Sequence, residues 1–88
     1  MTKKELTQLK ALKKKIEEVK ELINSKTKRR DSFAERAFYA PNTAAQDALE
    51  DVVRDLEGEI YDLQKELKQL EEELKPLLEK AEAEKVDA

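Results

Sequence analysis

The feature that most constrains this chain is an unbroken heptad repeat in its second half. Apolar residues recur there in alternating steps of three and four, at Leu49, Val53, Leu56, Ile60, Leu63, Leu67, Leu70, Leu74, Leu77 and Ala81. About five heptads held in one register are typical of a long amphipathic helix that packs lengthwise against another helix. The chain therefore needs a second long helix, either in the same molecule or in a partner.

The first part of the chain carries a second stripe with the same spacing, at Leu9, Leu12, Ile16, Val19 and Ile23. We predict one helix over residues 2–28 and another over residues 44–85. Thr43 and Gln46 have the spacing of a capping box before the second helix, and Pro76 predicts a kink within it, because proline removes a backbone donor and clashes one turn back. The predicted fold is all-α: an antiparallel helical hairpin that forms a single domain over residues 1–88.

Residues 29–42 are predicted to connect the two helices. Ser32 and Glu35 again have capping-box spacing, which indicates a short connector helix over about residues 33–39. Phe33, Phe38 and Tyr39 belong to this segment. They fit either a hydrophobic lid over the end of the core or the wall of a ligand pocket, and the lid is favoured because aromatic side chains chiefly supply buried area.

Charge divides the chain into two opposite halves. Residues 1–30 hold eleven basic and four acidic side chains, a net charge of +7, whereas the remainder carries −10 and the whole chain −3. Pairing the predicted helices would match basic residues of the first helix with acidic residues of segment 51–66, and these basic residues are Lys10, Lys13, Lys14, Lys15 and Lys20. Individual surface ion pairs contribute little, but their sign helps to set partner and register.

A compact basic cluster follows the first stripe, at Lys26, Lys28, Arg29 and Arg30. We expect it to lie in the turn, away from the helix pairing, where it is a candidate contact for a phosphate or an acidic partner. A solvated turn is the favoured interpretation. Nucleic-acid binding is a weaker alternative, because the neighbouring Lys-rich helix lacks interleaved aromatic residues and its charge is interrupted by Glu17, Glu18 and Glu21.

The two predicted helices differ in length. At about 1.5 Å per residue the first would span roughly 40 Å and the second roughly 60 Å, so the apolar end of the second would project beyond the first. Burial of that end against another copy predicts a homodimer, either a four-helix bundle or an end-to-end pair joined through the projecting end, with a higher oligomer as the alternative. The residues assigned to this oligomer interface are Leu70, Leu74, Leu77, Leu78 and Ala81.

The composition provides few of the residue types that enzymes use for catalysis. The chain contains no His and no Cys, and its serines, Ser25 and Ser32, have no histidine to activate them. No Gly-rich phosphate loop is present, and the helix seams are aliphatic. We predict a protein that is not an enzyme and has no cofactor, metal or small-molecule substrate. With no apolar segment long enough for a bilayer and no secretory signal, we expect a cytoplasmic protein without membrane contact.

A family resemblance begins at the N-terminus, in residues Met1 to Lys10 (MTKKELTQLK) and Leu12 to Val19 (LKKKIEEV). These residues resemble the N-terminal coiled-coil segment of phage and prophage transcriptional regulators of the ArpU/RinA-like group. The layout is similar over about residues 1–75. In that group the second helix leads into a helix-turn-helix domain, which this sequence does not contain. The resemblance implies a phage or mobile-element setting in a bacterial host cell.

Three functions fit these observations, each using the hairpin as a binding module for itself and for an unidentified protein. The favoured one is a small regulatory adaptor or an inhibitor of a host protein, such as a defence nuclease. A structural or assembly scaffold is the first alternative. A DNA-associated transcriptional regulator that uses the basic cluster is the second.

Overall fold

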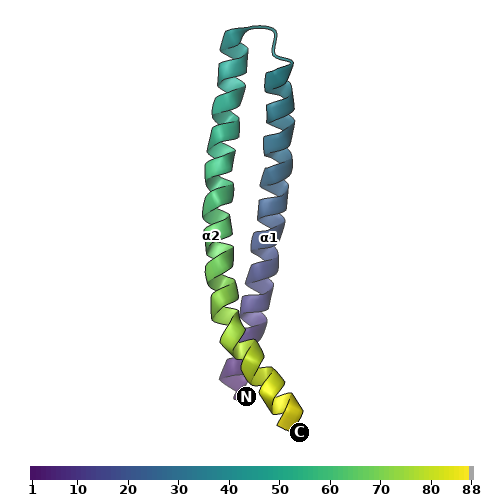
Figure 1. Cartoon of the computed structure of the whole chain (residues 1–88), viewed down its shortest axis with the longest axis vertical. Coiled ribbons are helices and arrows are strands. Elements are labelled where there is room, and N and C mark those ends of the chain that lie inside the picture. Colours follow the sequence, from purple (N-terminus) through teal and green to yellow (C-terminus); the bar gives the residue numbers. More distant parts are fainter. Residues whose placement is uncertain (88) are drawn as a thin grey trace.

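The computed structural model describes the backbone of residues 1–87 and the side chains of residues 1–84. It contains two helices, α1 (Lys3–Phe38) and α2 (Thr43–Asp87), which run antiparallel and form a rod of 66 × 16 × 15 Å (Figure 1). No strand occurs in the described part of the chain. The predicted all-α helical hairpin is confirmed.

Helix α1 begins with a complete capping box. The hydroxyl of Thr2 accepts a hydrogen bond from the Glu5 backbone N–H at 3.2 Å, and the Glu5 carboxylate accepts one from the Thr2 backbone N–H at 3.2 Å. Two of the backbone donors that an α-helix leaves unpaired at its start are satisfied in this way.

Helix α1 is longer than the sequence pattern indicated. It runs without interruption through residues 29–38, so the predicted end at residue 28 and the separate connector helix over residues 33–39 are corrected to one continuous helix. Neither Gly nor Pro occurs in this stretch, and Ala, Arg and Glu favour helix. Phe33, half-buried, and Ala37, buried, continue the spacing of the first stripe and give the added turns a packed face.

The connection between the helices is confined to residues 39–42. Pro41 cannot continue α1 and disfavours helical backbone at Ala40, which explains where the helix ends. At the start of α2 the Ala45 backbone N–H donates to Asn42 Oδ1 at 2.8 Å. Asn42 is therefore the N-cap in place of the predicted Thr43, and Gln46 donates to Glu50 at 3.3 Å instead of completing a capping box.

Helix α2 continues through Pro76 to Asp87. Figure 1 shows that its last turns change direction and cross α1 near the chain ends. Proline deprives the carbonyl one turn earlier of its donor and crowds it, which explains a bend in this part of the helix. The helix therefore bends in its last turns and does not end at Pro76.

The core is a single row of aliphatic layers along the helix interface, which we call the seam. Its centre is a cluster of Ile16, Val19 and Leu70, which are 5%, 4% and 7% exposed. Half-buried residues pack around this cluster, namely Leu12, Ile23, Leu63, Leu67 and Leu74. In the described residues no large side chain is fully enclosed, as expected for two helices with no third layer.

The longer α1 removes the predicted overhang of α2. Leu70 is buried against Ile16 and Val19 of the same chain, and Leu74 packs against this cluster. Leu77 and Ala81 are half-buried, and Leu78 is 36% exposed. The overhang that motivated an oligomer interface at these residues is therefore absent: α1 is ten residues longer than predicted, and the Met1 amino group at its start reaches Glu84 of α2.

Candidate protein-interaction surfaces

The end of the hairpin at the turn exposes two aromatic side chains. Phe38, the last residue of α1, is 81% exposed, and Tyr39, its C-cap, is 74% exposed. Their rings meet edge to face with centroids 5.1 Å apart. We call this pair the aromatic tip. The predicted lid is wrong for both residues, because the chain turns too tightly for either ring to fold back over the core.

A shallow depression of about 210 Å³ adjoins the aromatic tip. Its apolar walls come from both helices, with Ala34 and Ala37 on α1 and Val53 on α2, while Gln46 and Glu50 line its polar side. Phe38 forms one edge. The small alanines of α1 leave this hollow, and its size suits a single side chain of a binding partner.

The predicted basic cluster is divided by the helix instead of gathered in a turn. Lys26 donates to Glu59 of α2 at 3.0 Å, and Arg30 donates to the Asp31 carboxylate with both Nε and Nη2. Lys28 and Arg29 are exposed, and neither forms an ion pair with a described residue. Because α1 is helical here, consecutive residues point in different directions and the cluster has no common face.

Lys26 and Arg30 lie on the seam, contrary to the expectation that they avoid it. They fall between Ile23 and Phe33 in the three-and-four spacing, and their side chains are only 27% and 33% exposed. The register set by the Lys26–Glu59 pair places them against Ile60 and Leu56, which are 5% and 7% exposed. This register predicts that the methylene stems of the two cations cover apolar side chains of α2. The Lys26 ammonium reaches Glu59 of α2, whereas the Arg30 guanidinium binds Asp31 of α1.

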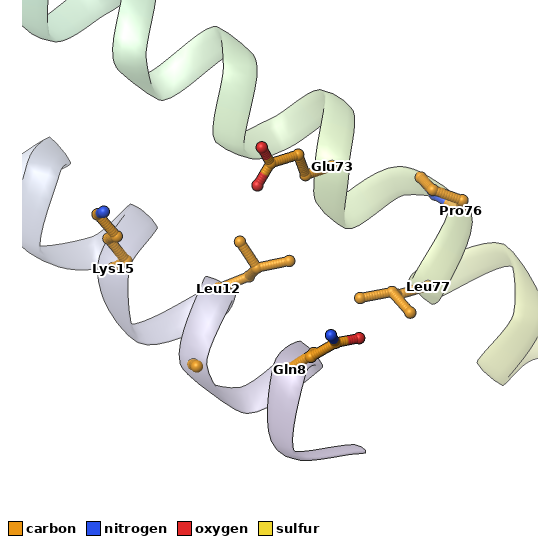
Figure 2. Close-up of a pocket in the computed structure, with 7 residues that line it drawn as sticks. Gln8, Leu12, Lys15, Glu73, Pro76 and Leu77 are labelled. Atoms are coloured by element: carbon orange, nitrogen blue, oxygen red, sulfur yellow. The ribbon is translucent and has the colours of Figure 1, made fainter. Parts of the chain in front are cut away.

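A groove lies between the helices where α2 bends. It has a volume of about 550 Å³ and is lined by Gln8, Ala11, Leu12, Lys15, Glu73, Pro76 and Leu77. In Figure 2, Leu12 and Leu77 project into the space between the two helices, and Lys15 and Glu73 lie at its rim. Ala11 and Pro76 are too small to fill it. We call this feature the flank groove.

A charged pair closes the open end of the hairpin. Lys80 donates to Glu5 Oε2 at 2.6 Å, and the Met1 amino group contacts Glu84. The hydrogen bond from Lys80, together with those from Thr2, lowers the pKa of Glu5 to about 2, and the same contact raises the pKa of Lys80. Of the predicted basic residues of α1, Lys15 pairs with Glu66 at 3.9 Å.

No sequence pattern directly indicates the flank groove or the exposure of the aromatic tip. The groove depends on the bend of α2 and on the true register, both of which depend on where α1 ends. A signal for the longer α1 was available: the three-and-four spacing continues from Ile23 to Ala37 once Lys26 and Arg30 are accepted as seam residues. Long basic side chains are compatible with such positions because their stems are apolar.

Within the described residues, neither helix is apolar enough over a sufficient length to cross a membrane, and no group of acidic side chains is arranged to hold a metal ion. Comparison of the chain with protein-family models, with curated proteins and with solved structures found no match.

Proposed function

We propose that this chain is a non-enzymatic protein–protein interaction module, a coiled-coil hairpin that binds a second protein with its aromatic tip. The observation that carries the proposal is the exposure of Phe38 and Tyr39, 81% and 74%, at the end of an otherwise highly charged rod. In keeping with the resemblance described above, the partner would be a bacterial host protein, such as a defence nuclease, and the chain a phage or mobile-element regulatory adaptor or inhibitor.

The exposed surface of the two rings is a source of binding free energy. An aromatic side chain buries roughly 150–250 Å² when it is covered, and each Å² of apolar surface contributes about 25 cal/mol. Two largely exposed rings therefore represent roughly 6–10 kcal/mol of potential binding free energy, before the entropy of association is subtracted. Aromatic residues are also enriched among the few that dominate protein interfaces.

The geometry of the tip supports a specific contact. The edge-to-face packing of the two rings limits their rotation, so less side-chain entropy is lost on binding. The depression formed by Ala34, Ala37 and Val53 offers a receptor for a side chain of the partner beside the rings. The aromatic tip would fit a pocket on the partner, and the depression beside it would receive a protruding side chain of the partner.

We also propose that the hairpin pairs with a second copy to form a four-helix bundle. The apolar residues that support this are not the ones predicted at the end of α2, since most of those lie in the seam. They are Leu22 and Val52, which are 49% and 37% exposed, together with the apolar lining of the flank groove.

The test is affinity capture from host cells followed by mass spectrometry, with three baits. The first is the unchanged chain, the second carries Phe38→Ser and Tyr39→Ser, and the third carries Tyr61→Ser. Tyr61 is also an exposed aromatic residue, 57% exposed, but it lies in the middle of α2, so it is a matched control.

We expect a partner that is retained by the unchanged chain and the control and lost from the tip variant. Binding of the purified partner, measured by calorimetry, should then weaken at least tenfold in the tip variant. Equal retention by all three baits would contradict a role for the tip. Circular dichroism of each variant verifies that the helices are intact.

A further inference from the structure

One flank of the hairpin is built from two rows of residues that recur every seven positions. The row on α1 consists of Gln8, Lys15, Leu22, Arg29 and Arg36. Among the described side chains, the row on α2 consists of Ala45, Val52, Glu59, Glu66, Glu73 and Lys80. Lys15 contacts Glu66, and the flank groove joins Gln8 and Lys15 to Glu73, so both rows lie on the same side. We call this side the groove flank.

The groove flank has apolar surface that the single hairpin leaves uncovered. Leu22 and Val52 are exposed on its two rows, and the flank groove of about 550 Å³ opens between them and the chain ends. The long face of the rod measures 66 by 16 Å, about 1,000 Å². Stable protein interfaces bury about 800 Å² on each partner, so this flank is large enough for a lengthwise contact.

The two rows of the groove flank differ in charge. Lys15, Arg29 and Arg36 give the α1 row three cations and no acid, whereas the α2 row has three carboxylates and one cation, Lys80, which is paired with Glu5. The helices as a whole follow the same division: α1 holds twelve basic and six acidic residues, and α2 six basic and fifteen acidic ones. The flank is therefore positive along one edge and negative along the other.

Two copies can meet through this flank about a twofold axis in two ways. If the axis runs across the rods, α1 lies on α1 and α2 on α2, and like charges face each other along the whole contact. If the axis runs along the rods, α1 of each copy lies on α2 of the other, and opposite charges meet. The sign of such contacts sets orientation even where each pair contributes little.

We infer that the occupant of the groove flank is a second copy of this chain, related by a twofold axis along the rod, so that both turns lie at the same end. This geometry rests on the proposed self-association and adds its orientation. Every helix in the bundle then has two antiparallel neighbours of opposite charge. It brings two aromatic tips together at one end, so that the dimer offers four rings to a partner.

Distance measurement between spin labels distinguishes the two orientations. The chain has no cysteine, so Ala44→Cys introduces a unique labelling site on the exposed first turn of α2. Because neighbouring helices pack about 8–10 Å apart, labels on the two copies should be about 15–30 Å apart when the turns share an end. Labels at opposite ends would be separated by a distance approaching the 66 Å length of the rod.

A matched experiment mixes this protein with one labelled through Thr7→Cys, which is exposed near the chain ends. Dimers with one label of each kind should add a long distance to the short distances of the like-labelled dimers. A long distance between two Ala44 labels, with a short one appearing only on mixing, overturns the orientation while leaving self-association and the role of the tip intact.

Charge reversal provides an independent readout. Arg29→Glu with Arg36→Glu changes two exposed residues that form no ion pair with a described residue, so the hairpin should keep its helix content. We expect dimer dissociation to become about tenfold easier at low ionic strength, because two cations that lie beside the acidic α2 of the other copy become anions. In the alternative orientation the two copies of α1 run antiparallel, so the new glutamates would lie near Lys15 of the other copy and the dimer would become tighter.

Sedimentation equilibrium of the unchanged chain completes the test. A dimer mass is expected at low ionic strength, with dissociation as salt is added. A monomer mass over the whole concentration range would overturn both the dimer and its orientation. Partner capture by the aromatic tip, which is measured separately with the Phe38 and Tyr39 variants, would then decide the remainder of the proposed function.

Discussion

Two segments of the same seam achieve similar burial by different chemistry. In the aliphatic segment, Leu70 is 7% exposed and packs against Ile16 and Val19. In the cationic segment, around Lys26 and Arg30, Leu56 is also 7% exposed, and the helix register places it opposite Arg30 instead of an aliphatic residue. A small exposed area therefore does not reveal what covers a residue. Aliphatic layers supply hydrophobic free energy, whereas cationic layers resist a shift of register, because sliding the helices would bury a charge.

The largest effect is expected in the aliphatic segment. Leu70→Ala should lower the free energy of unfolding by about 2–4 kcal/mol, because it removes a buried side chain and leaves a cavity between Ile16 and Val19. Urea unfolding followed by circular dichroism measures the change. Leu78→Ala is the control on the same helix, since Leu78 is 36% exposed, and it should lower stability by less than about 1 kcal/mol. Equal losses would remove the distinction between seam and surface.

The cationic segment should respond in the opposite direction. Arg30→Leu is expected to raise the free energy of unfolding by roughly 1 kcal/mol, because an apolar side chain covers Leu56 without desolvating a charge. The exposed neighbour provides the control: Arg29→Leu should change stability by less than about 0.5 kcal/mol. A loss of stability in the Arg30 variant would show that the cation stabilises the fold as well as the register.

The Arg30→Leu variant also tests whether the cations keep α1 and α2 in one register. With Arg30 replaced, fewer charges oppose sliding of α1 along α2, and backbone amide exchange at the helix interface should be faster than in the unchanged chain. Equal exchange rates in the Arg30→Leu variant would indicate that the aliphatic layers alone define the alignment of the helices.

A smaller gain is expected at Gly58, which lies between Leu56 and Ile60 on the exposed side of α2. A Cβ added there meets no atom within 4 Å. Gly58→Ala should therefore raise stability by about 0.5–1 kcal/mol through helix propensity alone. Thermal unfolding measures the gain, and amide exchange should slow in the neighbouring turns of the cationic segment. No change would imply that α2 is held here by packing and not by its own propensity.

The smallest effect concerns the charged pair at the other end of the aliphatic segment. The hydrogen bond from Lys80 lowers the pKa of Glu5 to about 2, below its ordinary value of 4.5. A group whose pKa is lowered on folding stabilises the fold above its ordinary pKa, and this contribution disappears as the pH falls toward the lowered value. Glu5→Gln should therefore reduce the melting temperature slightly at pH 7, and the difference should vanish near pH 2.

The measurement is a pair of thermal unfolding series across that pH range. Glu79→Gln is a suitable control, because Glu79 is an exposed carboxylate on α2 and forms no ion pair with a described residue. A constant difference between the Glu5 variant and the unchanged chain at every pH would show that the capping box, and not the ionised carboxylate, is responsible.

The heptad spacing was sufficient to predict the hairpin, since an unbroken aliphatic stripe such as that from Leu49 to Ala81 can be buried only along another helix. It was not sufficient to place the turn. Lys26 and Arg30 interrupt the apolar pattern of α1 without interrupting its packing, so the helix was predicted to end near residue 28. From that error followed the predicted overhang at Leu70 and the lid at Phe38.

The surfaces were less predictable than the fold for a physical reason. Exposure of Phe38 and Tyr39 depends on the few residues between them and Asn42, where Pro41 and the Asn42 cap fix a tight reversal. The flank groove depends on the bend of α2, which the sequence indicates only through Pro76. The exposed tip and the flank groove each depend on the backbone geometry at one or two positions. The seam, in contrast, follows from a heptad spacing that recurs along both helices.

Both chain ends lie together, as the contacts of Met1 with Glu84 and of Glu5 with Lys80 show, while the turn lies at the far end of a 66 Å rod. A body fused to either terminus would therefore be held at the base of a stalk, with Phe38 and Tyr39 presented at its full reach. Such a layout allows the hairpin to be grafted into an exposed loop of a larger protein, because the entry and exit points nearly coincide.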